Sequence, residues 1–221
     1  MNKLTLYTYY RSTAAYRVRI ALNLKQLDYT PYFVDLTKDG GEQHSSQYRD
    51  INPQGLIPIL IDGDTRVTQS LAIIEYLEER QPSPSLLPNT PLLRAQARSL
   101  TQQICCDIHP LNNLRVLNYL RTELKQDDAA RHRWYQHWIA EGLTALEQQL
   151  TQHGKHQSHC CFGDAPTIAD LCLIPQLYNT RRFNCDTSEY PTLNKIEDHC
   201  MTLTSFQQAA PEHQPDFKLS S

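Results

Sequence analysis

The sequence is short of several features, and each shortage narrows the class of protein. Its 221 residues include only 7 glycines, whereas long stretches are rich in leucine, glutamine, alanine and glutamate, a balance that favours helix. The formal net charge is only -3, and both signs are mixed along the chain. Without a basic stripe we expect no nucleic-acid partner. No apolar run reaches the length of a bilayer span, so we expect no membrane partner.

Signs of export are also missing. The start, MNKLTLYTYYRS, has Lys3 and then a strand-like alternation, without the small-residue cleavage site of a signal peptide. The seven cysteines are odd in number and include the adjacent pairs Cys105-Cys106 and Cys160-Cys161, which make a poor disulfide framework. We therefore predict reduced thiols and a cytoplasmic location.

The first eighty residues alternate between strand and helix patterns. Strands are predicted at 4–8, 32–36 and 56–61, and helices at about 14–26 and after Gln69-Ser70. A turn is expected at 62–64, where Asp-Gly-Asp follows an apolar run. The alternation predicts a small α/β unit with helices packed on a mixed sheet.

A proline-rich connector follows. The segment QPSPSLLPNTP at 81–91 has four prolines in eleven positions, which suits a stiff linker. Beyond it apolar residues recur at helical spacing, as in Tyr135, Trp138 and Ile139, and no convincing strand pattern appears. We predict an N-terminal domain at 1–81, a linker at 82–91 and an all-helical domain at 92–221.

Two features are predicted inside the helical domain. Pro110 and Pro175 interrupt apolar helical patterns, so kinks or breaks are expected near them. Thr167 and Asp170 have the spacing of a capping box. The residues after Asp170 are apolar on every face, so the capped helix is expected at the buried centre of the bundle.

Residues 11–19 place positive charges near the start of a predicted helix. Ser12 and Thr13 stand where a strand gives way to a helix, and Arg17 and Arg19 lie near the start of that helix. Hydroxyls are common N-caps, but cations oppose the positive end of the helix dipole. We therefore expect something negative nearby. The alternative is a plain N-cap with both arginines directed to water.

These residues carry a family resemblance. STAAYRVRIAL, which begins at Ser12, resembles the zeta-class glutathione transferase signature Ser-Ser-Cys-x-x-Arg-Val-Arg-Ile-Ala-Leu. QSLAIIEYLEE, which begins at Gln69, and short segments at 110–114 and 169–176 are also similar to that class. The resemblance implies an α/β thioredoxin-like N-terminal domain followed by an all-α C-terminal helical domain, the glutathione transferase fold. One position differs from the signature, because Ala14 stands where the family has cysteine. The role of that thiol would then fall to the hydroxyls of Ser12 and Thr13.

The resemblance also implies glutathione as the cofactor. A free cysteine thiol has a pKa of about 8.5, so only a minority is thiolate at neutral pH. A hydrogen bond from Ser12, helped by the helix dipole, would favour the anion. Lowering that pKa by one unit needs only roughly 1.4 kcal/mol.

Site residues are carried over from the family position by position. Catalytic roles are implied for Ser12, Thr13 and Arg17, and substrate carboxylates are expected to bind Arg11, Arg115 and Arg182, because guanidinium groups bind carboxylates bidentately. Contacts to glutathione are implied for Ser12, Thr13, Ala14, Ala15, Tyr16, Arg17, Gln43, Ile57, Pro58, Gln69, Ser70, His109, Asn113, Leu114 and Arg115.

Several of these residues also have ordinary structural explanations. The Ile57-Pro58 bond is implied to be cis, although most X-Pro bonds are trans. Ser70 suits the γ-glutamyl carboxylate and equally suits a helix cap. Gln43 fits a solvated loop glutamine, and His109 fits a packing residue.

The activity implied is glutathione-dependent cis-trans isomerisation of maleylacetoacetate, a small dicarboxylic keto acid, to fumarylacetoacetate in tyrosine and phenylalanine catabolism. Three alternatives stay open: maleylpyruvate isomerisation in gentisate degradation, a transferase or dehalogenase acting on small α-halo acids, and a binding protein that kept the fold without catalysis. Family members pair as two-fold dimers, so we expect a homodimer. No metal is predicted, because His153, His156 and His159 before Cys160 and Cys161 fit no standard zinc spacing.

Overall fold

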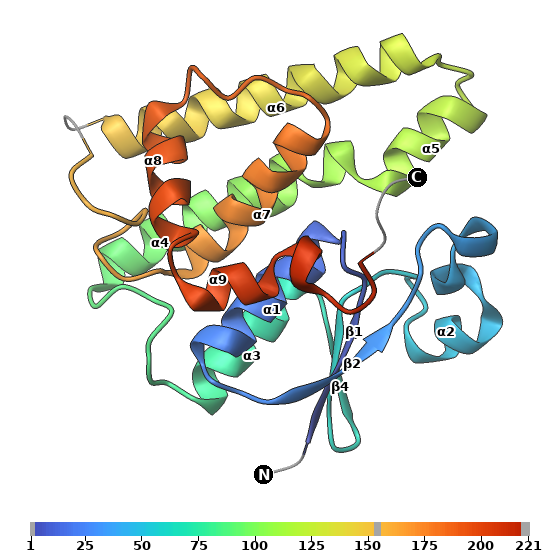
Figure 1. The fold of residues 1–221 in the computed structure, drawn as a ribbon, viewed down its shortest axis with the longest axis horizontal. Coiled ribbons are helices and arrows are strands. Elements are labelled where there is room, and N and C mark those ends of the chain that lie inside the picture. Colours follow the sequence, from blue (N-terminus) through green and yellow to red (C-terminus); the bar gives the residue numbers. More distant parts are fainter. Residues whose placement is uncertain (1–2, 153–155, 218–221) are drawn as a thin grey trace. The chain divides into compact units, whose positions relative to one another are not determined.

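The computed structural model describes residues 3–152 and 156–217, which form two units (Figure 1). Unit 1 comprises Met1–Leu86 and Thr202–Ser221, and unit 2 comprises Leu87–Met201. The first division falls inside the predicted proline-rich linker. The second differs from the expected organisation, because the chain after Met201 clusters with unit 1 instead of the helical domain. Helix α9 (Thr204–Ala209) packs on unit 1 and buries Phe206 completely.

Unit 1 is built on a four-stranded mixed sheet. Its strands are β1 (Leu4–Thr8), β2 (Tyr29–Phe33), β3 (Ile59–Asp62) and β4 (Thr65–Thr68). They lie in the order β2-β1-β3-β4, with β1 and β2 parallel and the other pairs antiparallel. The second strand begins three residues earlier than predicted. Pro31 fits there because β2 is an edge strand, and the apolar Val34 packs beyond the strand end beside Tyr48.

Helices cover both faces of this sheet. Unit 1 contains α1 (Thr13–Leu24), α2 (Ser46–Ile51), α3 (Ser70–Arg80) and α9. Helices α1, α3 and α9 lie on one side and α2 on the other (Figure 1). On the α2 side, Tyr48 joins Ile59 and Val34 in a buried apolar cluster.

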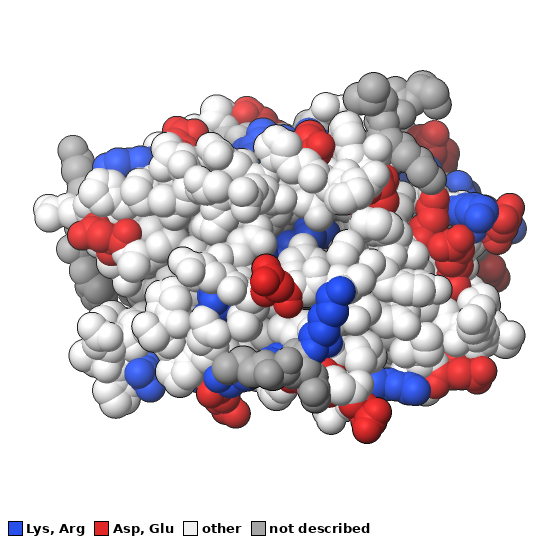
Figure 2. Space-filling view, turned by 60° about the horizontal axis from the view of Figure 1, so that its bottom comes forward, with Lys and Arg blue, Asp and Glu red and all other residues white. Residues whose placement is uncertain are grey.

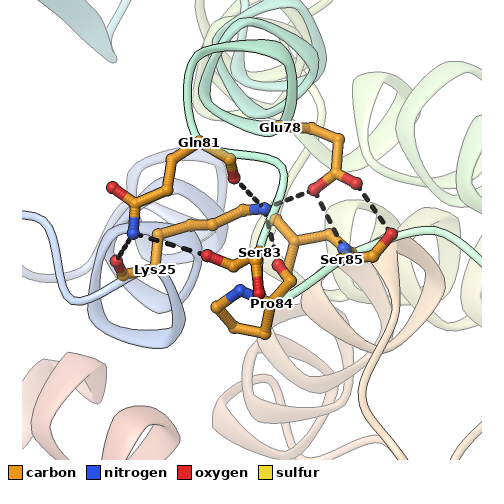
Figure 3. A network of polar contacts seen from close by, with 7 residues as sticks. Lys25, Glu78, Gln81, Ser83, Pro84 and Ser85 are labelled. Carbon is orange, nitrogen blue, oxygen red and sulfur yellow. Dashed lines mark hydrogen bonds and ion pairs between the residues drawn. The ribbon is translucent and has the colours of Figure 1, made fainter.

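A buried lysine ties unit 1 to its linker (Figure 3). Lys25 caps the C-terminal end of α1 and is fully buried. Its ammonium donates to the Glu78 carboxylate at 2.5 Å and to the carbonyls of Gln81 and Pro84 at 2.6 Å. A cation is favourable at a helix C-terminus, where carbonyls point outward. Ser85 donates to the second Glu78 oxygen at 2.8 Å, so the start of the proline-rich segment is fixed against α1 and α3.

Unit 2 is helical, as expected. Its helices are α4 (Pro91–Gln102), α5 (Leu114–Thr122), α6 (Asp128–Thr151), α7 (Ile168–Arg182) and α8 (Pro191–Cys200). After α4 a π-helical turn, Gln103–Ile108, leads into a 3-10 turn, Pro110–Asn112, so the interruption predicted at Pro110 is present. At Pro175 the helix does not break, because α7 continues through that residue, and the alternative of a kink there stays a prediction.

The capping box of α7 is confirmed. The backbone N-H and the hydroxyl of Thr167 both donate to Asp170 Oδ2, at 2.7 and 3.0 Å. The other oxygen accepts the Cys161 N-H at 2.8 Å. Nearly all of α7 is buried, as the apolar run after Asp170 predicts.

Charge of both signs is scattered over the visible surface, and Figure 2 shows no continuous basic stripe on that face. Among the residues that the structure describes, no helix combines the length and apolar character needed to cross a membrane.

Candidate functional site

The start of α1 presents a hydroxyl at the end of a turn. Ser12 is the N-cap, and its Oγ accepts the Ala15 N-H at 3.2 Å. Its own N-H donates to the Tyr9 carbonyl at 3.0 Å. The hydroxyl proton finds no acceptor among residues 3–152 and 156–217, so Ser12 is free to donate it. Thr13 begins the helix proper and is buried.

Arg17 is a buried cation with almost no protein partner. Arg17 is only 2% exposed, and its Nη1 donates to Ser70 Oγ at 3.3 Å. Both Nε and Nη2 are buried without a hydrogen-bond partner in the described part of the chain. Burial of an unpaired cation costs about several kcal/mol of free energy unless an anion lies beside it. The site therefore suits an anionic ligand.

The first turn of α3 supplies further donors beside Arg17. Gln69 precedes the helix with φ of 70°, and its side chain makes no cap hydrogen bond within the described residues. Its amide donates to Gln54 Oε1 at 2.9 Å, which holds the turn. Open N-H groups at a helix N-terminus bind anions, and Ser70 lies there within reach of the guanidinium. The structure places Arg17 beside Ser70, next to Gln69 along the chain. The implied catalytic role of Arg17 and the implied glutathione contacts of all three residues stay predictions.

The Ile57-Pro58 peptide is cis, as the family resemblance implies. The preceding Leu56 carbonyl accepts the Tyr48 hydroxyl and the Asn52 amide, both at 2.8 Å. Burial raises the pKa of Tyr48, so its hydroxyl stays a donor. These contacts hold the Ile57 backbone at the start of β3.

Gln43 is not a solvated loop residue. It is 6% exposed and its amide nitrogen lies 3.0 Å from His44 Nε2. The carboxamide folds over Gly41, where an added Cβ would come within 2.4 Å of it. Gly41 also has φ of 110°, a conformation that glycine adopts without strain. The Gln43 oxygen is buried and unpartnered among the described residues, so this side chain can still accept from a ligand.

The remaining candidates belong to unit 2. His109 Nε2 lies 3.5 Å from the Asn113 amide, and Asn113 caps α5 by accepting the Arg115 N-H at 3.1 Å. Leu114 and Arg115 are exposed at the start of that helix. Their contacts to glutathione stay predictions.

The arginines expected to bind substrate differ in setting. In unit 1, Arg11 donates through Nε to the Tyr10 hydroxyl at 3.0 Å. In unit 2, Arg182 donates to Asn179 at 3.0 Å and lies 4.7 Å from the centroid of the Phe183 ring. Both guanidinium groups are held by neighbours, and their contacts to substrate also stay predictions.

The metal-binding residue types that cluster in the structure share only Cys160 with the histidine-cysteine pattern of the sequence. His153 lies outside the described residues, and His156 Nε2 lies 2.9 Å from the Cys160 carbonyl. Ligand atoms of Cys160, Asp170 and Cys200 come within 4.8 Å of one another in unit 2. Asp170 is engaged as the cap of α7, and a hydrogen bond with Cys160, together with burial, raises the pKa of Cys200. This cluster is accounted for as buried packing, and we assign no metal to it.

Sequence reasoning missed the residues that hold the loop before Ser12. Arg19 was noted only for its charge, yet it is completely buried and donates to the Tyr10 carbonyl at 3.0 Å. Asp216 accepts the Tyr10 N-H at 2.9 Å across 206 positions of sequence. The charge of Arg19 within an apolar helix was a signal, but its acceptors could not be read from the chain.

A mixed four-stranded sheet flanked by helices and followed along the chain by a helical unit is the architecture of the glutathione transferases. Residues 6–85 match the family described as Glutathione S-transferase, N-terminal domain. A probable maleylacetoacetate isomerase of Vibrio cholerae is 49% identical over 98% of this chain and 99% of its own length.

Solved structures agree. A bacterial maleyl pyruvate isomerase, described as a zeta-class glutathione S-transferase in its holo form, has 41% identity and a TM-score of 0.92 over 97% of this chain and 100% of its own. A maleylacetoacetate isomerase from Methylobacterium extorquens AM1 with bound malonate and glutathione has the same identity, TM-score and coverage. The chain belongs to the zeta-class glutathione transferases, the family of the maleylacetoacetate and maleylpyruvate isomerases.

Proposed function

We propose that the chain is a glutathione-dependent cis-trans isomerase that converts maleylacetoacetate to fumarylacetoacetate in tyrosine and phenylalanine catabolism. The observation that carries the proposal is Arg17, a buried cation with two unpartnered nitrogens beside the open start of α3. Such a site fits a peptide carboxylate, which glutathione has. Malonate and glutathione bound to the Methylobacterium relative support the same ligand chemistry.

Glutathione supplies a thiolate that adds to the conjugated cis double bond, allows rotation about the resulting single bond and leaves unchanged. Ser12 holds that sulfur as an anion by donating its hydroxyl hydrogen, and the positive end of α1 adds to the effect. Ala14 offers no thiol of its own, so the hydroxyl carries this task.

Other residues bind and orient. Arg17, Ser70 and the first N-H groups of α3 receive the γ-glutamyl carboxylate, and the Ile57 backbone pairs with the main chain of the tripeptide. Arg11 presents a guanidinium to a substrate carboxylate from the turn before α1, since guanidinium groups bind carboxylates in a fixed geometry. Negative charge that develops on the substrate is stabilised by these same donors.

Maleylpyruvate is the second candidate substrate, because a relative with that activity is as similar in structure as the maleylacetoacetate isomerase. The two substrates share the cis double bond and the carboxylates, so the same residues serve both. We propose further that the protein works as a cytoplasmic homodimer, as the resemblance implies.

The function is tested with purified protein, glutathione and each substrate in turn. We expect isomerisation while the glutathione concentration stays constant, whereas a transferase or dehalogenase would consume it. Activity on neither substrate would refute the proposal.

A matched pair of variants locates the thiolate. Ser12→Ala should lower turnover by at least about tenfold, because the sulfur anion loses its hydrogen bond. Loss of one donor to an anion in an active site has effects of this order or larger. Thr13→Ala removes a neighbouring hydroxyl and should have a much smaller effect. Equal and small effects in both variants would show that the sulfur binds elsewhere.

A further inference from the structure

We propose that Asp216 is a positioning residue, through which the C-terminal segment holds the loop that carries Ser12. The segment, residues 202–217, is named here the C-terminal clasp and belongs to unit 1. The inference rests on the proposed glutathione-dependent function, because it concerns how Ser12 is placed for the thiolate.

The loop in question is short and closely held. Residues 9–12 connect β1 to α1, and a turn forms where the Ser12 N-H donates to the Tyr9 carbonyl at 3.0 Å. Arg19 reaches the loop from inside α1, donating to the carbonyls of Tyr9 and Tyr10 at 3.3 and 3.0 Å. It also donates to the Thr8 hydroxyl at 3.1 Å. One guanidinium therefore fixes the carbonyl side of the loop.

The clasp is attached to the same guanidinium. Arg19 Nε donates to the Ala209 carbonyl at 2.9 Å, at the end of α9. Farther along α1, the Asn23 amide donates to the Ser205 carbonyl at 2.9 Å. Phe206 is completely buried where α9 packs on α1. The clasp is thus an integral part of unit 1.

Asp216 completes the clasp at the loop itself. Its Oδ2 accepts the Tyr10 N-H at 2.9 Å, a bond strengthened by the charge of the carboxylate. The next residue, Phe217, packs edge-on against the Tyr10 ring with centroids 5.6 Å apart. Arg11 donates to the Tyr10 hydroxyl, so this side chain is held as well. Arg19 therefore donates to the carbonyls of the loop, and Asp216 accepts the N-H of Tyr10 in the same loop.

The consequence for chemistry is geometric. Ser12 lies two residues after Tyr10, so release of the Tyr10 N-H frees the turn that aims the Ser12 hydroxyl. A displacement of about 1 Å at a reacting group costs on the order of 10²-fold in rate. Asp216 itself acts only through the loop.

The first test compares Asp216→Ala with Asp216→Asn. The ultraviolet absorbance of thiolate, followed against pH, gives the pKa of glutathione bound to each variant without turnover. We expect Asp216→Ala to raise that pKa and to lower kcat by about tenfold, within the range for misplaced groups, while the KM for substrate changes little. Asp216→Asn keeps an acceptor oxygen for the Tyr10 N-H and should restore most of both values.

Two truncated chains supply a second test, which removes the whole contact with Tyr10 instead of the Asp216 side chain alone. A chain ending at Phe217 keeps the clasp and should behave as the full chain. A chain ending at Pro215 loses Asp216 and Phe217 and should match or exceed the defect of Asp216→Ala. If the shorter chain is unstable to heat, the comparison of the Ala and Asn variants decides alone.

The outcomes separate this inference from the proposed function. If the full chain isomerises and Ser12→Ala is defective, but Asp216→Ala and the shorter truncation leave the thiol pKa and kcat unchanged, the positioning role is refuted. If the full chain neither binds glutathione nor isomerises, the proposed function itself fails.

Discussion

Arg17 and Arg19 stand two residues apart on α1 and are both buried, yet the structure treats them in opposite ways. Arg19 donates to four oxygens, those of Thr8, Tyr9, Tyr10 and Ala209. Arg17 donates to one hydroxyl and leaves two nitrogens unpartnered in the described residues. Since successive helical residues turn by about 100°, the two side chains leave opposite sides of α1. A buried charge that is fully hydrogen-bonded holds a fold together, whereas one left unmatched marks a binding site.

Lys25 belongs with Arg19 in this comparison. It is the third buried cation of the α1 region, and a carboxylate and two carbonyls surround its ammonium. Its role is to attach the start of the linker. Replacing each cation by methionine, which keeps an unbranched apolar stem, therefore separates structural from ligand-binding charge.

Arg19→Met should have the largest effect on the fold. Each buried oxygen that loses its donor costs about 1–3 kcal/mol, so we expect the free energy of unfolding to fall by at least about 3 kcal/mol. Urea unfolding followed by circular dichroism measures it. Arg121→Met, at an exposed arginine of α5, should change the free energy by less than about 0.5 kcal/mol. A loss at Arg19 no larger than this control would contradict the structural role.

Lys25→Met should have the second-largest effect. Removing one partner of a buried ion pair leaves Glu78 without its cation, although Ser85 and the Leu86 N-H still donate to that carboxylate. We expect the free energy of unfolding to fall by about 2–3 kcal/mol, less than when a buried charge keeps no partner at all. The double variant Lys25→Met with Glu78→Gln should recover part of the loss in the same urea experiment. No recovery would mean that the carbonyl contacts, and not the carboxylate, determine the cost.

Arg17→Met should have the smallest effect on the fold and a clear effect on binding. Because it removes a buried charge with one weak partner, the free energy of unfolding should stay within about 1 kcal/mol or rise. Glutathione affinity, measured by calorimetry, should fall by at least about tenfold, since a charged hydrogen bond to a carboxylate is lost. Arg17→Lys keeps the charge and should bind better than Arg17→Met. Destabilisation as large as that of Arg19→Met would erase the distinction between the two arginines.

Local patterns predicted much of this fold correctly. The first strand at 4–8, the capping box at Thr167 and Asp170 and the buried helix that follows all depend on neighbours within a few residues. The signature at Ser12 through Leu22 identified the family, because motif residues keep their spacing whatever their distant partners are. The second strand was misplaced, since the apolar residues at 34 and 36 serve the core beyond the strand and alternation alone does not distinguish these uses.

The sequence by itself determined which residue types stand at the start of α1 and that two cations lie there against the helix dipole. Only the tertiary structure decided that Arg19 is surrounded by oxygens and Arg17 is not. Those oxygens come from the end of β1, from the loop after it and from a segment nearly two hundred positions away. The same holds for Asp216, whose pairing with Tyr10 spans 206 positions. Helix caps and periodicity are set by local backbone geometry, but the compensation of a buried charge depends on which distant groups folding brings beside it.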